Sequence, residues 1–460
     1  MKTLFPTQAK AADIFLEHLN NGRHTLDSSD VGTGKTVVAA HIANKLGRRP
    51  GTRVTGGGAP VAVLCPKAVI PTWERELKEV GVSPLFVMNY EKIRTGKTLF
   101  MSKRGKKILR WHLPQGTLVL LDEVHKCKGP WTINAQILIS LVKYAKPMGI
   151  RIHAMSATAA EDPTEMRGLG YMLGLHNLNH DRSGHGMGPS WFSWMKSYGC
   201  FQNEWGKWQL ISRKKLDGLR KLIYNPVIND HGRIVKRQQG HKLTIEDFPD
   251  SFKNNRVFVE PVEFKNSAKI LKAYDDLGLT PSIIEDYIEN GTVTDSEHIL
   301  VNILRARQLA ESLKIPCIAD MAQDLLDQNK SVVVFVNFKD SVDALCESLN
   351  CGRIDGGQSV EERQKVVDDF QNDRKRVIVV NIKAGGTGLS LHDVTGKHNR
   401  VSLISPTFSA KDHAQALGRI HRNGAKSHAL QKVLVASGSV EENILKAINR
   451  KLANLHALHG

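Results

Sequence analysis

A glycine-rich segment near the start of the chain has the composition of a phosphate-binding loop. Residues 28–36 read SSDVGTGKT, and the apolar spacing of the next ten residues, VVAAHIANKL, predicts a helix. Gly32 and Gly34 let backbone N–H groups converge on phosphate oxygens at the N-terminus of that helix. Lys35 supplies a point charge to the β- and γ-phosphates, and Thr36 can ligate Mg²⁺. The predicted nucleotide-binding residues are Gly32, Thr33, Gly34, Lys35 and Thr36.

One position in this loop departs from the usual pattern. Ser29 stands where that pattern has its first glycine. A second GKT string, at 96–98, lacks both the upstream glycines and a helical pattern downstream, and we interpret it as an ordinary loop. Phosphate binding at 28–36 therefore needs support from a second element.

Two adjacent carboxylates after an apolar run provide that element. Residues 118–125 read LVLLDEVH, a pattern that predicts a buried strand ending at Asp122 and Glu123. Because hard cations prefer oxygen ligands, we predict that Asp122 holds Mg²⁺ beside the phosphate loop. Glu123 would orient and deprotonate the attacking water. Two acids in a surface turn are common, but together with Lys35 they predict hydrolysis of a nucleoside triphosphate.

Hydrolysis also needs positive charge for the leaving γ-phosphate, and the second half of the chain offers a pair of arginines. Arg419 and Arg422 lie three residues apart in the segment QALGRIHRNG and share one face if that segment is helical. Such a pair by itself more often forms a solvated face or a salt bridge. We interpret this pair as catalytic because of the motifs that surround it.

The elements expected to position these residues form two α/β units. Short β-rich apolar runs alternate with helical patterns, as in parallel sheets that are buried on both faces. From about 165 to 328, long helical stretches and polar loops replace the alternation, which predicts a helical insertion and a linker. The predicted strands begin at Val61, Thr117, Arg151, Val332, Val377 and Arg400, and the predicted helices cover 37–46, 71–79, 341–349 and 360–370.

Composition narrows the class of protein. The chain has 460 residues, and its 64 basic and 46 acidic side chains give a net charge of +18, which attracts polyanions such as nucleic acid. No apolar run approaches the roughly 18 residues of a membrane helix, so we expect neither membrane contact nor an export signal. The six cysteines form no CxxC pair, which favours a reducing compartment.

The order of the motifs resembles that of superfamily 2 helicase-type motors, and within them the Swi/Snf family of double-stranded DNA translocases. The resemblance extends from Leu4 to about Ile448 and is most specific in AGGTGLSL and GRIHRNG. The stretch WFSWMKSYGCFQNEWGKW is similar to the fork-remodelling, strand-annealing branch. The matching segments, in chain order, are LFPTQ, LCPKAVIPTWERELKE, DEVHKCKG, MSATA, VVVFVNFKDSVDAL, RIDGGQSVEERQKVVDDF, NIKAGGTGLSLHDV and QALGRIHRNG.

The resemblance implies an α/β fold with two RecA-like parallel-sheet lobes and helical insertions between the motor motifs, with ATP bound in the cleft between the lobes. The implied cofactors are ATP and Mg²⁺. The implied divisions are lobe 1 at 1–164, its helical insertion at 165–255, a linker and helical insertion of lobe 2 at 256–328, and lobe 2 at 329–460.

Several residue roles follow from the resemblance alone. Gln8 would sense adenine at the start of the chain. The second lobe would act on ATP through Gln415, Arg419 and Arg422. Contact with nucleic acid would come from Lys67, Asn337 and Thr387.

We expect a nucleic-acid-dependent ATPase, and three functions remain open. The first is a motor that moves along or remodels duplex or forked DNA. The second is a helicase that separates strands of DNA or RNA, which Ser156-Ala157-Thr158 favours because the family usually has a TGT-like motif there. The third is an ATP-regulated clamp or recruitment subunit. A protein partner would supply specificity. The expected location is the cytoplasm, of a bacterium or of a virus's host cell, with a nuclear location left open.

Four of the seven tryptophans lie in one short stretch and have two interpretations. They could stack on bases or wedge a junction. A tryptophan-rich helical insertion more often builds its own small core, and we favour that interpretation. The four are Trp191, Trp194, Trp205 and Trp208.

Basic and metal-ligating residues outside the motifs are less decisive. The basic runs at 103–110 and 213–221 could contact backbone phosphates or be solvated. One group of potential zinc ligands matches no common zinc spacing, and we expect no zinc site there. Its members are His176, His180, His185 and Cys200.

Overall fold

The computed structural model shows two compact units. The first contains Met1–Asp247 with Asn454–Gly460, and the second contains Phe248–Ala453. The structure describes residues 3–47, 59–104, 108–178, 189–204, 206, 208–228, 234–236, 238–248, 251–262, 264, 266–290, 297–385 and 389–459.

The first unit is built on a six-stranded sheet in which all strands are parallel. Its strand order is β13-β1-β8-β7-β2-β3, so β8 lies between β1 and β7. Because parallel strands point the same way, the segments that follow them emerge at one edge of the sheet. The strands are β1 (Thr25–Asp27), β2 (Val61–Cys65), β3 (Phe86–Asn89), β7 (Leu118–Asp122), β8 (Arg151–Met155) and β13 (Gly240–His241).

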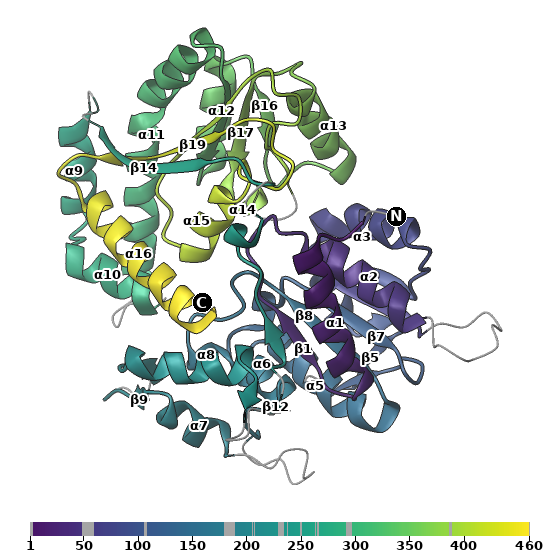
Figure 1. The fold of residues 1–460 in the computed structure, drawn as a ribbon. Coiled ribbons are helices and arrows are strands. Elements are labelled where there is room, and N and C mark those ends of the chain that lie inside the picture. The colour runs from purple at the N-terminus through teal and green to yellow at the C-terminus, as the bar shows by residue number, and fades with distance from the viewer. Residues whose placement is uncertain are drawn as a thin grey trace. The chain divides into compact units, whose positions relative to one another are not determined.

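Helices connect successive strands of this sheet. α2 (Lys35–Gly47) joins β1 to β2, α3 (Ile70–Glu79) joins β2 to β3, and α5 (Ile133–Met148) joins β7 to β8. α1 packs beside α2 (Figure 1). The remaining helices are α1 (Pro6–Asn20), α4 (Tyr90–Ile93), α6 (Arg167–Met172), α7 (Trp191–Ser197) and α8 (Leu216–Tyr224), with short 3₁₀ turns η1 (Lys67–Val69), η2 (Val124–Cys127), η3 (Pro163–Glu165), η4 (Arg213–Lys215) and η5 (Ile245–Asp247).

Short antiparallel strands complete the first unit. One ribbon follows α4, and two further pairs lie between α7 and β13. These strands are β4 (Lys97–Thr98), β5 (Met101–Arg104), β6 (Ile108–Trp111), β9 (Cys200–Gln202), β10 (Trp208–Leu210), β11 (Val227–Ile228) and β12 (Ile234–Lys236).

The second unit repeats the parallel architecture with different connections. Its six strands are all parallel and follow the order β14-β19-β18-β15-β17-β16. The strands are β14 (Asn255–Val262), β15 (Ser331–Val336), β16 (Gly352–Ile354), β17 (Val377–Asn381), β18 (Arg400–Ile404) and β19 (Ala429–Ala436). The helices are α9 (Ser267–Asp275), α10 (Pro281–Asn290), α11 (Glu297–Asp327), α12 (Lys339–Ser348), α13 (Val360–Gln371), α14 (Ile382–Gly385), α15 (Ala410–Leu417) and α16 (Val440–His459). From Asn454 on, α16 belongs to the first unit.

The two parallel sheets confirm the α/β class, and all six predicted strands are present. Each was recognisable because its residues are buried almost throughout, as in β2 and β15, where every residue is buried. The expectation that 165–328 holds only helices and loops is wrong. β14 pairs with β19 over eight residues at the edge of the second sheet. Its side chains are largely exposed and it contains Pro261, which an edge strand tolerates.

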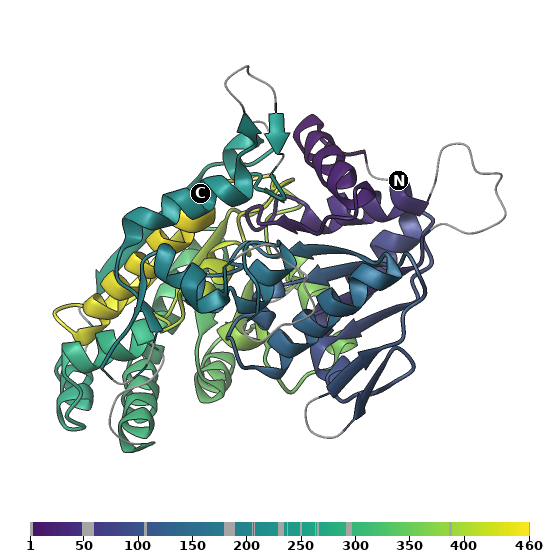
Figure 2. The same ribbon diagram turned by 90° about the horizontal axis from the view of Figure 1, so that it is seen from below.

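The long helix α11 carries charged residues into the interior of the second unit. α9 packs against it (Figure 2). The Lys314 ammonium on α11 donates to the Glu441 carboxylate on α16 at 2.6 Å, and both side chains are buried. The second Glu441 oxygen accepts from the Ala436 N–H at 3.0 Å. Within the described part of the chain, no helix combines the length and apolar character needed to cross a membrane.

Replacing Lys314 with Met should destabilise the second unit strongly. The substitution leaves the Glu441 carboxylate buried without its cation, which costs about 3–5 kcal/mol of unfolding free energy. Urea unfolding followed by circular dichroism measures the loss. The matched control is Arg374→Ala, which removes a 2.7 Å ion pair with Asp369 from an exposed arginine and should cost at most about 1 kcal/mol. Equal losses in the two variants would contradict the prediction.

Candidate nucleotide-binding and nucleic-acid-binding site

The predicted phosphate loop follows β1 and leads directly into α2, which begins at Lys35. Gly32 and Gly34 have φ values of 90° and 93°, a region that disfavours other residues. A Cβ atom added at Gly34 would also lie 2.5 Å from the Gln8 amide nitrogen. The backbone path of the loop therefore requires both glycines, and the space around Gly34 gives a second reason for glycine there.

The Lys35 ammonium is folded back onto the loop. Its Nζ donates to the carbonyl oxygens of Ser29 and Asp30 at 2.6 and 2.9 Å. Burial lowers the pKa of Lys35, whereas nearby carboxylates raise it. These carboxylates belong to Asp27, Glu123, Asp122 and Asp30. A triphosphate would therefore replace the two carbonyls as hydrogen-bond acceptors of an ammonium that is already in place.

Ser29, the departure from the usual pattern, has a structural role in the loop. Its Oγ accepts a hydrogen bond from the Leu243 N–H at 2.9 Å, and its own N–H donates to the Asp27 carboxylate at 2.9 Å. Asp30 N–H donates to the Leu243 carbonyl at 2.9 Å, and Lys242 forms an ion pair with Asp30 at 3.5 Å. A glycine at position 29 could not make the side-chain bond, so this serine ties the loop to the segment after β13.

Gln8 contacts the phosphate loop through its side-chain amide. Its Nε2 donates to the Thr33 carbonyl at 2.7 Å, and its Oε1 accepts from the Phe5 N–H at 3.0 Å. The side chain is buried. Gln8 thus fixes the start of α1 against the loop, and its contact with adenine stays a prediction.

Asp122 ends β7, as expected, and is held by two aromatic side chains. Its Oδ2 accepts from the Trp73 indole at 2.8 Å, and its backbone carbonyl accepts from the Tyr90 hydroxyl at 2.9 Å. Burial, with the neighbouring Glu123 carboxylate, raises the pKa of Asp122 above the ordinary value of a carboxyl group. The Asp122 carboxyl group offers oxygen, the donor that a hard cation prefers, so its chemistry fits Mg²⁺.

Glu123 adopts a left-handed conformation, with φ 53° and ψ 51°, which is uncommon for a residue other than glycine. Its Oε2 accepts from the Ser156 hydroxyl at 3.2 Å and lies 3.0 Å from His125 Nδ1. His125 Nδ1 also lies 2.9 Å from the Ser156 hydroxyl oxygen. The Ser156 N–H donates to the Asp27 carbonyl at 3.0 Å. This network joins the ends of β1, β7 and β8.

The arginines of the second unit do not share a helix face, because α15 ends at Leu417 and both follow it in a turn. Arg419 is buried, and its Nη1 donates to the Leu389 carbonyl at 3.3 Å. Arg422 donates through Nη1 to the Ser390 hydroxyl at 3.0 Å and through Nε to the Gly418 carbonyl at 3.1 Å. Gln415 lies buried on α15. The two arginines therefore hold the segment at Leu389 and Ser390 by hydrogen bonds.

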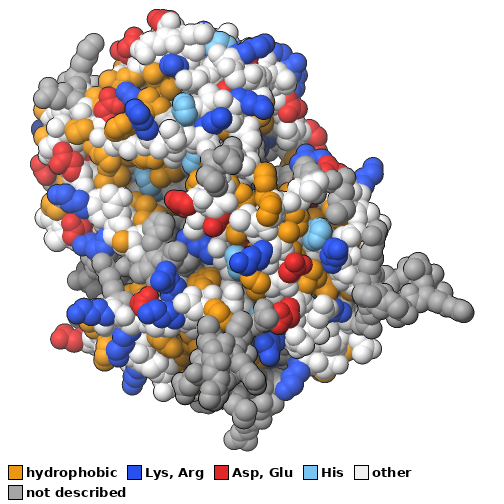
Figure 3. All heavy atoms as spheres, viewed as in Figure 1, with side chains coloured by type: hydrophobic (Ala, Val, Ile, Leu, Met, Phe, Trp, Pro, Cys, Tyr) orange, Lys and Arg blue, Asp and Glu red, His pale blue; other side chains and the backbone are white. Residues whose placement is uncertain are grey.

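The three predicted nucleic-acid contacts have different surroundings. Lys67 is exposed in η1, directly after β2. Asn337 follows β15, and its amide nitrogen donates to Glu311 at 2.6 Å and to the Pro406 carbonyl at 2.9 Å. Glu311 is buried and also accepts from the Asn337 N–H. Thr387 lies outside the described residues. On the face shown in Figure 3, Lys and Arg side chains lie in small groups between acidic and apolar ones.

The tryptophan-rich stretch is part of a core, as expected, but it shares the main core of the first unit instead of building a small core of its own. Trp191 and Trp194 are buried in the main hydrophobic cluster of the first unit, and Trp208 packs against it. Trp205 lies outside the described residues. His176 packs against the Trp194 ring at 4.9 Å, and burial lowers its pKa to about 4. The other two histidines of the group of potential zinc ligands, His180 and His185, lie outside the described residues.

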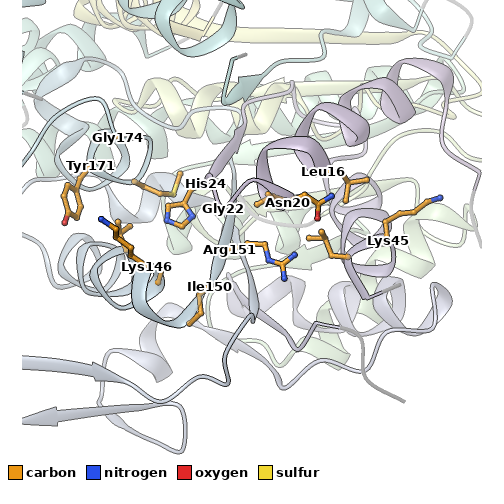
Figure 4. A pocket seen from close by; sticks show the side chains of 16 residues that line it. Leu16, Asn20, Gly22, His24, Lys45, Lys146, Ile150, Arg151, Tyr171 and Gly174 are labelled. Carbon is orange, nitrogen blue, oxygen red and sulfur yellow. The ribbon is translucent and has the colours of Figure 1, made fainter. Parts of the chain in front are cut away.

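A cavity of about 980 Å³ lies at the opposite edge of the first sheet, where β1 and β8 begin (Figure 4). Its lining includes four basic residues. Lys45 and Lys146 belong to the last turns of α2 and α5, where positive charge complements the helix dipole. The helix ends thus account for Lys45 and Lys146, and burial lowers the pKa of His24 to about 4. The residues that line the cavity do not include the phosphate loop. The four are His24, Lys45, Lys146 and Arg151.

Sequence reasoning missed several residues that shape the site. Trp73 lies on α3 and Glu311 on α11, and neither the spacing nor the composition around them indicates their contacts. The SAT motif was recognised by resemblance, but its hydrogen bond to Glu123 was not expected. The sequence around Ser156 does not reveal this partner, because Glu123 follows a different strand, β7.

Comparisons with known proteins agree with this arrangement. The helicase conserved C-terminal domain family matches residues 314–424. A protein of Acanthamoeba polyphaga mimivirus, named as a candidate ATP-dependent RNA helicase, is 30% identical over 99% of this chain and 83% of its own length. Protein CHROMATIN REMODELING 24 of Arabidopsis thaliana is 21% identical over 96% of this chain. A DNA repair and recombination protein RAD54-like of Drosophila erecta is 34% identical over 27% of this chain.

These relatives differ in length from this chain. The alignment covers 45% of the Arabidopsis protein and 16% of the Drosophila protein. A solved structure of the Sulfolobus solfataricus SWI2/SNF2 ATPase core in complex with dsDNA is 17% identical, with 98% of this chain and 92% of that chain covered and a TM-score of 0.37. A TM-score this low does not support a fold assignment, which rests instead on the strand order described above.

The site and the mimivirus relative together define a helicase-type, ATP-dependent motor. The chain belongs to the helicase family that this mimivirus relative represents. It is a nucleic-acid-dependent ATPase.

Replacing Ser156 with Ala should lower kcat for ATP hydrolysis about 10-fold, or about 1.4 kcal/mol, with the KM for ATP within about two-fold of wild type. The variant removes the hydroxyl that donates to Glu123 and leaves the phosphate loop intact. Steady-state ATPase kinetics measure both constants. Ser102→Ala is the matched control, since Ser102 also pairs with a histidine, His112, at 2.8 Å but on an exposed strand. Equal kcat values for both variants would count against the network.

Proposed function

We propose that this chain is a Mg²⁺-dependent ATPase that moves along or remodels duplex or branched DNA. The observation that carries the proposal is the common location of Lys35, Asp122 and Glu123. Asp122 ends β7, Glu123 follows it, and the loop that leads to Lys35 follows the parallel strand β1 at the same edge of the first sheet. The Lys35 ammonium interacts electrostatically with both carboxylates. Lysine and paired acids in this arrangement are suited to phosphoryl transfer to water.

The residues of the first unit have distinct proposed roles. Lys35 binds the β- and γ-phosphates in exchange for its loop carbonyls, and Gly32, Thr33 and Gly34 donate backbone N–H groups. Thr36 and Asp122 hold Mg²⁺, which when bound neutralises charge on the phosphates. Glu123 orients the attacking water and accepts its proton. Gln8 recognises adenine from the start of α1.

The second unit supplies the remaining positive charge in this proposal. Gln415, Arg419 and Arg422 act on the same nucleotide when the two units close, as the family resemblance implies. Support comes from the fixed position of the Arg419 and Arg422 turn, which hydrogen bonds to Leu389 and Ser390. We also propose the domain division at 1–164, 165–255, 256–328 and 329–460.

Nucleic acid would be bound mainly through its phosphates. Lys67 is exposed and suited to a backbone phosphate. The amide nitrogen of Asn337 already donates to Glu311 and Pro406, so Asn337 would position the loop after β15. Thr387 would also contact nucleic acid, as the family resemblance implies. Affinity should then fall steeply with salt and depend little on base sequence.

DNA is the proposed track because relatives are named for chromatin remodelling and for DNA repair and recombination. A strand-separating helicase on DNA or RNA is the second candidate. The SAT sequence at 156–158 favours it, and the mimivirus relative is named as an RNA helicase. An ATP-regulated clamp or recruitment subunit is the third, and the complete set of Lys35, Asp122 and Glu123 argues against it. A protein partner would supply specificity.

Two substitutions in the first unit should separate nucleotide binding from hydrolysis. Glu123→Gln should lower DNA-stimulated kcat at least about 100-fold while ATP still binds, because only the proton acceptor is lost. Lys35→Ala should abolish binding as well, since the charge facing the phosphates disappears. Binding of a fluorescent ATP analogue and steady-state ATPase rates give the two readouts. Arg422→Ala should resemble Glu123→Gln. ATPase activity unchanged by any nucleic acid would refute the motor.

A comparison of two displacement assays should distinguish the first two candidates. A motor that tracks along duplex DNA displaces the third strand of a triplex without opening the duplex beneath it, whereas a strand-separating helicase releases one strand of a forked duplex. We expect triplex displacement that depends on ATP and is lost in Glu123→Gln. Displacement of the forked strand alone, on DNA or RNA, would favour the helicase instead.

A further inference from the structure

Trp131 is an exposed aromatic residue on the segment that follows the catalytic carboxylates. It lies between η2 and α5 and is 64% exposed. Ile133, two residues later, is 50% exposed. Trp191 and Trp194 of the same unit are buried in its core. ATP hydrolysis as proposed above makes no use of the Trp131 side chain.

The Trp131 indole is fixed in position by its neighbours. The guanidinium carbon of Arg167 lies 4.4 Å from the Trp131 ring centroid, a cation–π contact. The Trp191 ring meets it edge to face, with centroids 6.1 Å apart and an interplanar angle of 81°. Arg167 is itself held, because its Nη1 donates to the Pro130 carbonyl at 2.9 Å. A side chain ordered before binding loses little conformational entropy when a ligand arrives.

The surroundings of Trp131 connect it to the hydrolytic site. Lys128, three residues earlier, forms ion pairs with Glu161 and Glu165 at 3.1 and 2.7 Å. Both glutamates belong to the segment that runs from the end of β8 to Arg167. A ligand on Trp131 would therefore contact the segment after β7, which holds Trp131, and the segment after β8, which leads to Arg167. The hydrogen bond from Ser156 to Glu123 joins the same two segments.

We propose that Trp131 stacks on an unpaired base, so that the protein recognises a single-stranded arm or gap beside a duplex. The proposal rests on the nucleic-acid-driven ATPase function proposed above. Bases within a duplex are stacked on each other, whereas an unpaired base offers its face to an aromatic side chain. The Arg167 guanidinium beside the ring suits the phosphate of the stacked nucleotide. The competing explanation is that Trp131 only covers Trp191.

The test compares two DNA substrates in the full-length protein. One is a blunt duplex, and the other is the same duplex with oligo(dT) arms. The concentration of each that gives half-maximal ATPase stimulation is measured for wild type, Trp131→Ala and Trp131→Phe. Leu99→Ala is the matched control, since Leu99 is 88% exposed on the same unit.

Stacking predicts a selective loss in Trp131→Ala. Its half-saturating concentration of forked DNA should rise about 10-fold, while the value for blunt duplex should change less than about two-fold. Trp131→Phe keeps a ring and should stay within about three-fold of wild type on both substrates. Leu99→Ala should match wild type.

Equal losses on both substrates, or no loss on either, would overturn the stacking role. Circular dichroism checks that Trp131→Ala is folded, and Trp131→Gln, which keeps side-chain bulk without a ring, replaces it otherwise. The ATPase response of the wild type to the two DNAs separates the proposed motor function from the proposed stacking role. If neither DNA stimulates the wild type, the motor function itself is contradicted. In that case fluorescence anisotropy of a labelled oligo(dT) still tests Trp131, with undiminished binding by Trp131→Ala counting against stacking.

Discussion

The ammonium of Lys35, on a half-buried side chain, makes the contacts on which the arrangement of the hydrolytic residues depends. It is hydrogen bonded to two loop carbonyls and lies near the carboxylates of Asp27, Asp30, Asp122 and Glu123. Burying one cation is unfavourable unless opposite charges and hydrogen bonds surround it. The parallel sheet meets that requirement, because the loops after β1 and β7 emerge at the same edge. The positive charge that attracts these carboxylates is also the charge that phosphates need.

Within each unit, a few polar contacts join motifs that are distant in sequence. In the first unit the Ser156 hydroxyl connects the SAT segment to Glu123, and Ser29 connects the phosphate loop to Leu243. In the second unit Arg419 and Arg422 hold the segment at 389–390. A shift of one motif can therefore move the motif that it contacts directly, and the core between them need not rearrange. Such links offer a physical route by which nucleic-acid binding and ATP hydrolysis influence each other.

The success of sequence reasoning varied with how local each feature is. The strands at 61–65 and 331–336 were predictable because burial on both faces demands a continuous apolar run. β14 was not, because an edge strand with exposed side chains lacks that run. Arg419 and Arg422 would share a face only in a helix, and that condition is not met because α15 ends at Leu417. The roles of the predicted site residues stay predictions, although Lys35, Asp122 and Glu123 do lie at one edge of one sheet.

By itself the sequence determined which chemical groups the protein carries and on which kinds of element they lie. A glycine loop before a helix and a pair of acids after a strand are defined by neighbours a few residues away, so they can be read along the chain. Only the tertiary structure decided what holds those groups. The partners of Ser29 and Glu123 lie 214 and 33 residues distant, and the strand order alone brings them within hydrogen-bonding reach.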